Sequence, residues 1–279
     1  MYYLSIACIA KNEDLYLEEW VNFHRAAGAE HFFIYDNGST VPIKQLLSKY
    51  INANIVDVID FPGKIMQMPA YSHCLKNYGH LSKWIAFVDC DEFIVPKSND
   101  DIKEVLKDYE NYGGLVVNWL FFGSGGHITR PDGLVTENFI MSSHKDWCLN
   151  NHIKSIVQPE RTQSIGDPHF FKYKPPYFAV SEAKINIPGS IVFKCKDCCT
   201  PGAPETHLSG NINANKIQVH HYYTKSEEEF MVRYYGGSCY ATSPTRSNME
   251  GFRGLSRVCN IENKEAHRFI DKTKSLYIK

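Results

Sequence analysis

Long apolar runs, an excess of charge of one sign and a regular cysteine pattern are all missing from this sequence of 279 residues. No apolar run approaches the roughly 20 residues that a helix needs to span a bilayer. The apolar start, residues 1–10, lacks the basic region of a signal peptide and runs straight into polar residues. We therefore expect no transmembrane segment and a cytosolic protein that is at most peripheral to a membrane.

The charge balance is nearly neutral, with 30 Lys and Arg against 31 Asp and Glu. Bulk attraction to nucleic acid has little support from such a balance, and we expect no nucleic-acid partner. The hydrophobic content of 43% and charged content of 22% are those of an ordinary globular chain. Aromatic residues reach 13%, which suits a carbohydrate-binding surface but equally a packed core.

The nine cysteines are odd in number and irregularly spaced, unlike a secreted disulfide framework. Cys195, Cys198 and Cys199 form a cluster that would hold zinc only with further ligands. No second C-x-x-C motif is present to supply them. We expect reduced thiols instead.

The first third of the chain alternates between strand and helix patterns. Apolar strand patterns cover residues 3–10, 31–35, 55–60 and 84–88, and helical spacing covers 14–27, 41–50 and 68–79. Gly28 ends the first helix. This alternation predicts an α/β fold with parallel crossovers and a Rossmann-like, mostly parallel sheet flanked by helices.

The remainder of the chain changes character. A strand is expected at residues 115–122 and another at 216–223, with a loop-rich, proline-containing stretch between them. Ser226 and Glu229 form a capping box for a helix over 226–235. We expect a catalytic domain over residues 1–225, with a nucleotide-binding half (1–115) and a loop-rich acceptor-binding half (116–225). Residues 226–279 would form a helical extension packed on it.

The strongest local signal is the sequence that follows the strand at residues 84–88. This strand brings three carboxylates, Asp89, Asp91 and Glu92, to the edge of the sheet. Alternate residues of extended backbone point the same way, so Asp89 and Asp91 could converge on one hard cation such as Mn²⁺ or Mg²⁺. The ion would bridge a nucleotide diphosphate as the sugar–phosphate bond breaks. The alternative is an acidic turn that caps the next segment.

Two further polar clusters follow the first and second strands. They are Asn12-Glu13 and Asp36-Asn37-Gly38-Ser39. Ligands bind beyond the carboxyl ends of such strands. Asp36 or Asn37 could accept a hydrogen bond from a base, and Ser39 could contact ribose or phosphate. An Asx turn followed by helix capping would use the same residues.

Two later segments carry weaker signals. Residues 123–127 form a glycine-rich loop that lacks both the dinucleotide and the P-loop spacing, and it ends at His127. In the segment starting at His220-His221, one of the two histidines could donate nitrogen to the same ion. Lys225 could pair with phosphate. A flexible loop and a structural histidine are the alternative interpretations.

These motifs, taken in order, resemble a known family. Residues 8–13, 17–20 and 35–39 are similar to family-2-like glycosyltransferases of the GT-A fold. Asp89 to Ile94, Asn118-Trp119, residues 122–127, Lys154 to Val157 and His221 to Ser226 resemble the family-92 group in particular. The resemblance spans residues 4 to 235 and implies a nucleotide-sugar donor, a glycan acceptor, and Mn²⁺ or Mg²⁺ at the D-x-D motif.

The resemblance also implies roles for single residues. Asp91 would bind the metal directly, Asp89 would lie nearer the ribose or a metal-bound water, and His221 would be the later ligand. The expected metal ligands are thus Asp89, Asp91 and His221. The nucleotide contacts expected from residues and resemblance together are Ala10, Asn12, Glu13, Asp36, Asn37, Ser39, Asp89 and Lys225.

Two departures from the family pattern matter. Animal and plant members usually carry an N-terminal membrane anchor, and its absence here points to a bacterial or viral enzyme of the cytosol. No catalytic base can be matched to the family. An inverting transferase needs a group that deprotonates the acceptor hydroxyl. Asp146, Asp167 and His127 are candidates, with Asp146 first, because Trp147 beside it could stack on a sugar ring.

Three functions remain open from the sequence alone. The first is a metal-dependent glycosyltransferase that uses a UDP-linked or similar donor and inverts the anomeric centre. The second is a sugar-phosphate nucleotidyltransferase, which would need a basic glycine-rich loop after the first strand, where the chain has Lys11 to Asp14. The third is a carbohydrate-binding protein without turnover, against which the acidic cluster argues.

Overall fold

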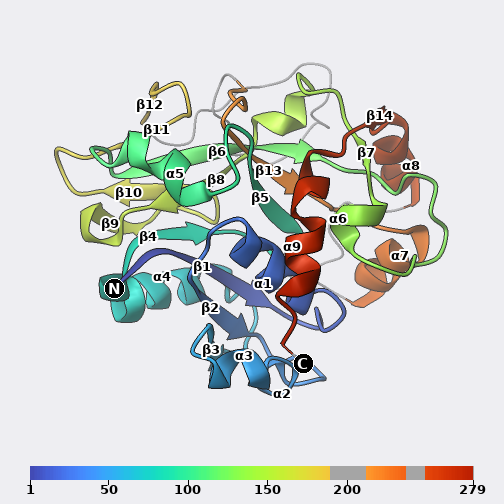
Figure 1. Cartoon of the computed structure of the whole chain (residues 1–279), viewed down its shortest axis with the longest axis horizontal. Helices are drawn as coiled ribbons and strands as arrows, with labels where there is room; N and C mark the ends of the chain where they lie inside the picture. The colour runs from blue at the N-terminus through green and yellow to red at the C-terminus, as the bar shows by residue number, and fades with distance from the viewer. Residues whose placement is uncertain (189–211, 237–248, 279) are drawn as a thin grey trace.

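The computed structural model describes residues 1–188, 212–236 and 249–278. The cluster Cys195, Cys198 and Cys199 lies outside these residues. Figure 1 shows a central twisted sheet with helices packed on its faces. Its strand order is β12-β11-β6-β8-β4-β1-β2-β3, and β13 joins this sheet by pairing with both β5 and β6.

The strands of the sheet have the following bounds: β1 Tyr2–Ala10, β2 His31–Asp36, β3 Val56–Asp60, β4 Ser82–Phe87, β5 Glu92–Pro96, β6 Gly114–Phe121, β8 Ile153–Val157, β11 Ala179–Val180, β12 Asn186–Ile187 and β13 Ile217–His221. Two small sheets pair β9 (Thr162–Ile165) with β10 (Phe171–Tyr173), and β7 (Met141–Ser142) with β14 (Ile261–Glu262). The α-helices are α1 Leu17–Ala26, α2 Ile43–Leu46, α3 Ser48–Asn52, α4 Gln67–Tyr78, α5 Ile102–Leu106, α6 Val135–Asn138, α7 Glu227–Gly236, α8 Met249–Val258 and α9 Ile270–Ser275.

The pairing confirms the mostly parallel sheet expected for a GT-A fold. β3, β2, β1 and β4 are parallel neighbours, and β6 pairs in parallel with β13. Among the central strands, β8 is antiparallel to both β4 and β6. All carboxyl ends of the parallel strands therefore face one edge, where α/β proteins place their ligands.

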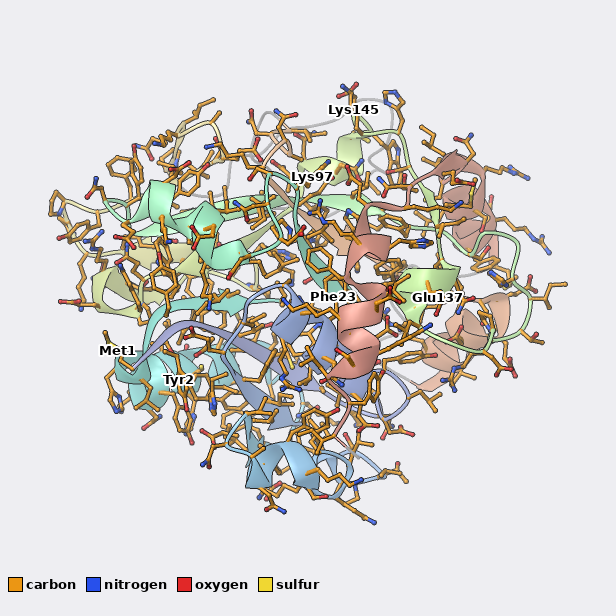
Figure 2. All side chains as sticks on the ribbon, viewed as in Figure 1. Met1, Tyr2, Phe23, Lys97, Glu137 and Lys145 are labelled. Atoms are coloured by element: carbon orange, nitrogen blue, oxygen red, sulfur yellow. The ribbon has the colours of Figure 1, made fainter. Side chains whose placement is uncertain are left out.

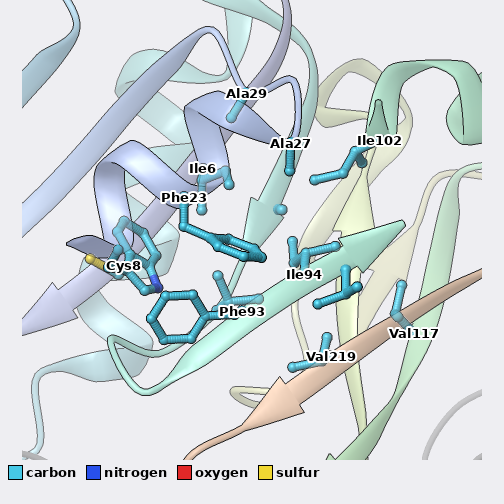
Figure 3. Close-up of a cluster of buried hydrophobic side chains, with 14 of the residues drawn as sticks. Ile6, Cys8, Phe23, Ala27, Ala29, Phe93, Ile94, Ile102, Val117 and Val219 are labelled. Carbon is cyan, nitrogen blue, oxygen red and sulfur yellow. The ribbon is translucent and has the colours of Figure 1, made fainter. Parts of the chain in front are cut away.

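Apolar side chains cover both faces of the sheet. α1 packs Trp20, Val21 and Phe23 against one face, and Phe23 lies between Ile6 and Phe93 in Figure 3. On the other face, α4 packs Ala70, Tyr71 and Cys74 against the alternate residues of β1 and β2. Because both faces are buried, the strands consist of nearly continuous apolar runs rather than alternating ones.

Most predicted elements are present, with two differences. The helix expected over residues 41–50 is two short helices, α2 and α3, joined at Leu47. The strand β5 was not expected, because it begins at Glu92 inside the acidic motif and its apolar run, Phe93 to Val95, is short; the helix α5 was not expected either. The capping box is confirmed, since Ser226 Oγ accepts from the Glu229 N–H at 3.3 Å and Glu229 accepts from the Ser226 N–H at 3.0 Å.

The C-terminal residues return to the first helix. α9 lies against α1 (Figure 1). Lys274 of α9 pairs with Glu137 at 2.8 Å, and Figure 2 shows Glu137 beside this helix. No helix within the described ranges is long and apolar enough to cross a membrane. The domain boundaries at residues 115 and 225 stay predictions.

The cysteines follow the sequence expectation in part. Cys8, Cys74, Cys90 and Cys259 are buried free thiols. Cys148, however, is disulfide-bonded, so the expectation of reduced thiols is wrong at this position. Sequence spacing carries a signal only for compact disulfide frameworks, and Cys148 stands alone in a loop-rich stretch.

His24 locks α1 to β5 in a way that predicts a pH dependence of stability. Its Nδ1 donates to the Trp20 carbonyl at 2.9 Å and its Nε2 accepts from the Ile94 N–H at 3.0 Å. The bond from the Ile94 N–H needs the neutral ring, because a protonated Nε2 has no lone pair to accept it, and burial lowers the pKa of His24 from 6.5 to about 3. The contribution of His24 to the free energy of unfolding is therefore fully present above pH 6.5. It is lost as the pH falls from 6.5 towards 3, by up to about 1.4 kcal/mol per pH unit.

Urea unfolding between pH 7 and pH 4 tests this prediction. His24→Gln is expected to lower the free energy of unfolding at pH 7, because the Ile94 N–H loses its partner. Below pH 6.5, the free energy of unfolding of the variant should also fall less steeply with pH than that of the unsubstituted protein. His80→Gln, at an exposed position, is the matched control and should keep the original slope. Equal slopes in the His24 variant and the control would contradict the assignment.

Candidate active site

The acidic turn after β4 is held in place by α1. Trp20 Nε1 donates to the carbonyls of Asp89 at 3.1 Å and Glu92 at 2.9 Å. His24, one helical turn later, fixes Ile94. Residues spaced by four lie on one helix face, so a single face of α1 positions the backbone on both sides of the turn.

A buried lysine on β8 holds Asp89. Lys154 Nζ lies 2.7 Å from Asp89 Oδ2 and 3.3 Å from Glu92 Oε2, and its side chain is 1% exposed. Asp89 Oδ1 accepts from Gln67 at 2.9 Å and from Tyr71 at 3.3 Å. Both carboxylate oxygens of Asp89 are thus engaged by the protein.

Glu92 is the most enclosed carboxylate of the motif, with 0% exposure. Its Oε2 accepts from the Asp89 N–H at 2.8 Å, while its Oε1 is buried and has no partner among the described residues. Burial, which Lys154 offsets only in part, raises the pKa of Glu92 to about 8. Glu92 therefore stabilises the turn rather than facing a ligand.

Asp91 faces a different set of partners. Its Oδ2 lies 2.6 Å from Arg233 Nη1 and 3.6 Å from His221 Nε2. Its side chain is 5% exposed. Burial acts to raise the pKa of Asp91, but the charges of Arg233 and His221 outweigh it and hold that pKa well below the usual range. Asp91 is therefore a carboxylate anion wherever the protein is folded.

The convergence of Asp89 and Asp91 on one ion stays a prediction, but its premise of extended backbone is wrong. β4 ends at Phe87, so the two aspartates lie in a turn and not in extended backbone, and the alternation rule does not apply to them. Among the described residues, no group of three potential ligands is gathered. Asp91 and His221 remain as one oxygen and one nitrogen donor in reach of each other. This pair fits a divalent ion that takes its other ligands from a diphosphate.

The loops after β1 and β2 are bound to each other. The Asn12 N–H donates to Ser39 Oγ at 3.0 Å, and Asn12 Oδ1 accepts from the Thr40 N–H at 2.8 Å. Asn37 N–H donates to the Ala10 carbonyl at 2.9 Å. Asn12 has a φ of 55°, in the left-handed region, as this crossing requires. The predicted residues Ala10, Asn12 and Ser39 are thus brought together.

Asp36 and Asn37 act locally in this structure. Asp36 Oδ1 accepts from the Ser39 N–H at 2.8 Å and Oδ2 from the Ile43 N–H at 3.0 Å, so the carboxylate closes the turn and caps α2. Asn37 Nδ2 donates to the carbonyls of Phe61 and Gly63. This is the Asx-turn alternative. Their contact with a nucleotide stays a prediction.

Lys225 and Arg130 approach the same aromatic ring. Lys225 Nζ lies 4.1 Å from the centre of the Tyr16 ring and Arg130 Cζ lies 5.5 Å from it. Lys225 is 7% exposed and has a φ of 48°. Left-handed backbone at a residue other than glycine is costly and gathers at functional sites. The structure thus brings Lys225 to the rim that carries Asn12 and Glu13.

Two cavities meet at the acidic turn. The first, which we name the β1 cavity, has a volume of about 420 Å³ and is lined among others by Ala10, Asn12, Glu13, Tyr16, Arg130 and Lys225. The second, the Trp119 cavity, has a volume of about 360 Å³ and is lined among others by Ile65, Gln67, Trp119, Pro168, His169 and His221. Asp89, Asp91, Tyr223 and Arg233 line both cavities and form their common wall.

The three candidate bases are not part of this wall. Asp146 is 68% exposed in a loop, beside His144. Asp167 Oδ1 accepts from the N–H groups of His169 and Phe170, which closes a turn. His127 packs its ring edge on Phe139, 5.4 Å away. None of the three is among the residues that line either of these two cavities. The structure gives their proposed role no support.

The structure adds residues that the sequence did not single out. In the sequence, Lys154 stands out only as part of a motif that resembles the family-92 group, and Arg233 is one of several charges on a predicted helix. The available signal was a lysine inside an apolar stretch, because lysine is rarely buried unless it is paired. No local signal existed for Arg233, because its partner Asp91 lies 142 residues away in the chain.

Comparison with known proteins identifies the family. The model of glycosyltransferase family 92 matches residues 2–234. A family 92 protein of Ricinus communis is 29% identical over 166 residues, which cover 58% of this chain and 29% of that protein. A galactan beta-1,4-galactosyltransferase of Arabidopsis thaliana is 29% identical over 111 residues, or 36% of this chain and 21% of that protein.

The overlap with these proteins is partial. This chain spans about a third or less of the length of the curated relatives it matches. The solved structure of S. aureus TarS 1–349 with UDP aligns at a TM-score of 0.39 and 16% identity, covering 56% of this chain and 47% of that one, which is too low to carry an argument. The match of the family model across residues 2–234 is decisive by itself: the chain belongs to glycosyltransferase family 92.

Proposed function

We propose that this chain transfers a sugar from a nucleoside-diphosphate sugar, UDP-linked in the first instance, to a glycan acceptor, with the help of Mn²⁺ or Mg²⁺ and with inversion at the anomeric carbon. The observation that carries the proposal is the common wall of the two cavities. There Asp91 and His221 approach each other beside the β1 cavity, which is lined by the end of β1 and by residues that follow β13. The metal would be held by Asp91 and His221 and would neutralise charge on the leaving diphosphate.

The charges of the β1 cavity favour a divalent ion with the diphosphate. Its lining holds four cationic side chains, Lys11, Arg130, Lys225 and Arg233, and five carboxylates, Glu13, Asp89, Asp91, Glu228 and Glu229. A diphosphate alone would enter a cavity without excess positive charge. A bound divalent cation reverses that balance, which supports its place in the proposal.

The chain's own residues divide the remaining tasks. Lys225, held over Tyr16, lies where a phosphate could pair with its ammonium group. Asn12 and Glu13 offer an amide and a carboxylate to the nucleoside at the end of β1. The Trp119 cavity presents aromatic faces and polar side chains, which suits the faces and hydroxyl groups of a sugar acceptor.

A donor panel tests the proposal. The protein is incubated with UDP-galactose, UDP-glucose, UDP-N-acetylglucosamine and GDP-mannose, with Mn²⁺ or with EDTA, and released nucleotide is measured. The galactan galactosyltransferase relative puts UDP-galactose first. We expect nucleoside diphosphate to form and EDTA to lower its rate by on the order of 100-fold. NMR of the new glycosidic bond reports inversion or retention.

The same panel separates the other functions. Release of pyrophosphate from a nucleoside triphosphate and a sugar phosphate would favour a nucleotidyltransferase. The acidic Glu13 at the end of β1 argues against that activity. Sugar affinity without metal or nucleotide affinity would favour a binding protein. The cytosolic location stays a prediction, and the disulfide-bonded Cys148 counts against it, because disulfides persist in oxidising compartments.

A further inference from the structure

Arg233 holds the carboxylate that the proposed function assigns to the metal. Its Nη1 lies 2.6 Å from Asp91 Oδ2 and 3.3 Å from the Tyr223 carbonyl, and its Cζ lies 5.0 Å from the centre of the Tyr223 ring. The side chain extends from α7 to the common wall of the two cavities and is 40% exposed. A role for Arg233 in metal binding therefore rests on the proposed function.

A guanidinium and a divalent ion would compete for Asp91 Oδ2 in this geometry. Arg233 occupies Oδ2, the oxygen that also faces His221 Nε2 at 3.6 Å. A metal bound between Asp91 and His221 would lie within a few ångströms of the guanidinium, and two positive charges at that separation repel each other strongly at a poorly hydrated site. Metal binding between Asp91 Oδ2 and His221 therefore requires Arg233 to leave.

Arg233 has an alternative partner once a donor is bound. Nη1 makes both of its hydrogen bonds within the described part of the chain, so Nη2 and Nε remain available to a ligand in the cavities. The planar guanidinium binds phosphate through two parallel hydrogen bonds. A diphosphate in the β1 cavity would also meet Lys225 on the same side. The released arginine would thus gain charge-assisted bonds in place of those it loses.

We infer that Arg233 stays paired with Asp91 in the donor-free protein and blocks the metal there. When the donor binds, Arg233 moves to its diphosphate, so that the nucleotide and the metal enter the site together. The consequence is positive coupling between the two ligands, which must be equal in both directions. Without nucleotide, the metal competes with a tethered cation. With nucleotide, that cation is drawn away and the diphosphate supplies further oxygen ligands.

Binding of Mn²⁺ tests the inference without any turnover. Free Mn²⁺ is measured by its EPR signal in titrations of the full chain, with and without saturating UDP. For the unsubstituted protein we expect UDP to increase the affinity for Mn²⁺ by about tenfold or more. Arg233→Met keeps the apolar stem and removes the charge. It should increase the affinity for Mn²⁺ without UDP by about tenfold and weaken UDP binding measured without metal.

Two further variants complete the test. Arg233→Lys retains a cation and should keep the weak binding of Mn²⁺ in the absence of UDP. Arg268→Met removes an arginine that pairs with Asp100 at 3.2 Å, away from both cavities, and should bind like the unsubstituted protein. An affinity for Mn²⁺ without UDP that is unchanged in Arg233→Met would overturn the inference. Absence of Mn²⁺ binding in every protein, even with UDP, would overturn the proposed function and the inference with it.

Discussion

Replacing Asp91 with alanine is expected to lower kcat/KM for sugar transfer by on the order of 1000-fold, which corresponds to about 4 kcal/mol of transition-state stabilisation. Asp91 forms part of the common wall of the two cavities, and its carboxylate lies close to His221. Without it, His221 alone would have to hold the ion. The affinity for Mn²⁺ in the presence of UDP should fall together with the rate.

The Asp91 variants should remain folded, which makes the result interpretable. The backbone carbonyl of Asp91, which accepts from the Tyr222 N–H at 2.8 Å, is unaffected by the substitution. Arg233 loses its partner but is exposed enough to be solvated. Asp91→Asn keeps the shape of the side chain and should lose nearly as much activity as Asp91→Ala. Their thermal midpoints should lie within a few degrees of the original.

Asp60→Ala provides the matched control for this loss. Asp60 also ends a parallel strand of the same sheet, but its carboxylate is 67% exposed and pairs with the surface residue Lys44. Its removal should leave kcat/KM within about twofold. An Asp91→Ala protein that transfers sugar at the original rate would remove the metal role from this residue. A loss of activity in the Asp60 control as well would point to a general effect on the sheet edge.

How much of this site could be predicted depends on the sequence separation between the residues that interact in it. Strong apolar periodicity within one element predicted the bounds of β1 and β2 to within one residue and those of β4 and α1 to within three, and the topology then placed their loops at one edge. The convergence of Asp89 and Asp91 on one ion was predicted from extended backbone, in which residues two apart point the same way. The chain turns after Phe87, and the two carboxylates take different partners.

Partners from distant parts of the chain explain the rest. Lys154 reaches Asp89 from β8 only because that strand enters the sheet antiparallel, between β4 and β6. Nothing in the local sequence shows this insertion. The candidate base Asp146 was chosen for its neighbour Trp147, and this local argument gave no information on its distance from the cavities. Side chains in loops were therefore the least predictable part of the site.

Lys154→Met is expected to destabilise the protein more than the Asp91 substitutions or the loss of an exposed charge. Its ammonium group lies between Asp89 Oδ2 and Glu92 Oε2, with 1% exposure. Removal of the cation leaves the Asp89 carboxylate without its ion-pair partner, and it also removes the charge that opposes the rise in the pKa of Glu92. Breaking a buried ion pair in this way costs about 3–5 kcal/mol. The thermal midpoint should fall by on the order of 10 °C.

A double-mutant cycle separates the charge effect from the loss of packing. In Lys154→Met combined with Glu92→Gln, the buried acid that has to take up a proton on folding is gone, so part of the lost free energy of unfolding should return. Lys83→Met is the matched control on the neighbouring strand. Lys83 pairs with Glu110, but both side chains are about a third exposed, and the loss should stay below about 1 kcal/mol. If the Lys154 and Lys83 variants unfold at the same temperature, the buried ion pairs of Lys154 contribute no more to stability than the partly exposed pair of Lys83. If only the Lys154 variant is strongly destabilised and Glu92→Gln restores part of the loss, the cation on β8 holds the acidic turn in the shape that presents Asp91 to its ligands.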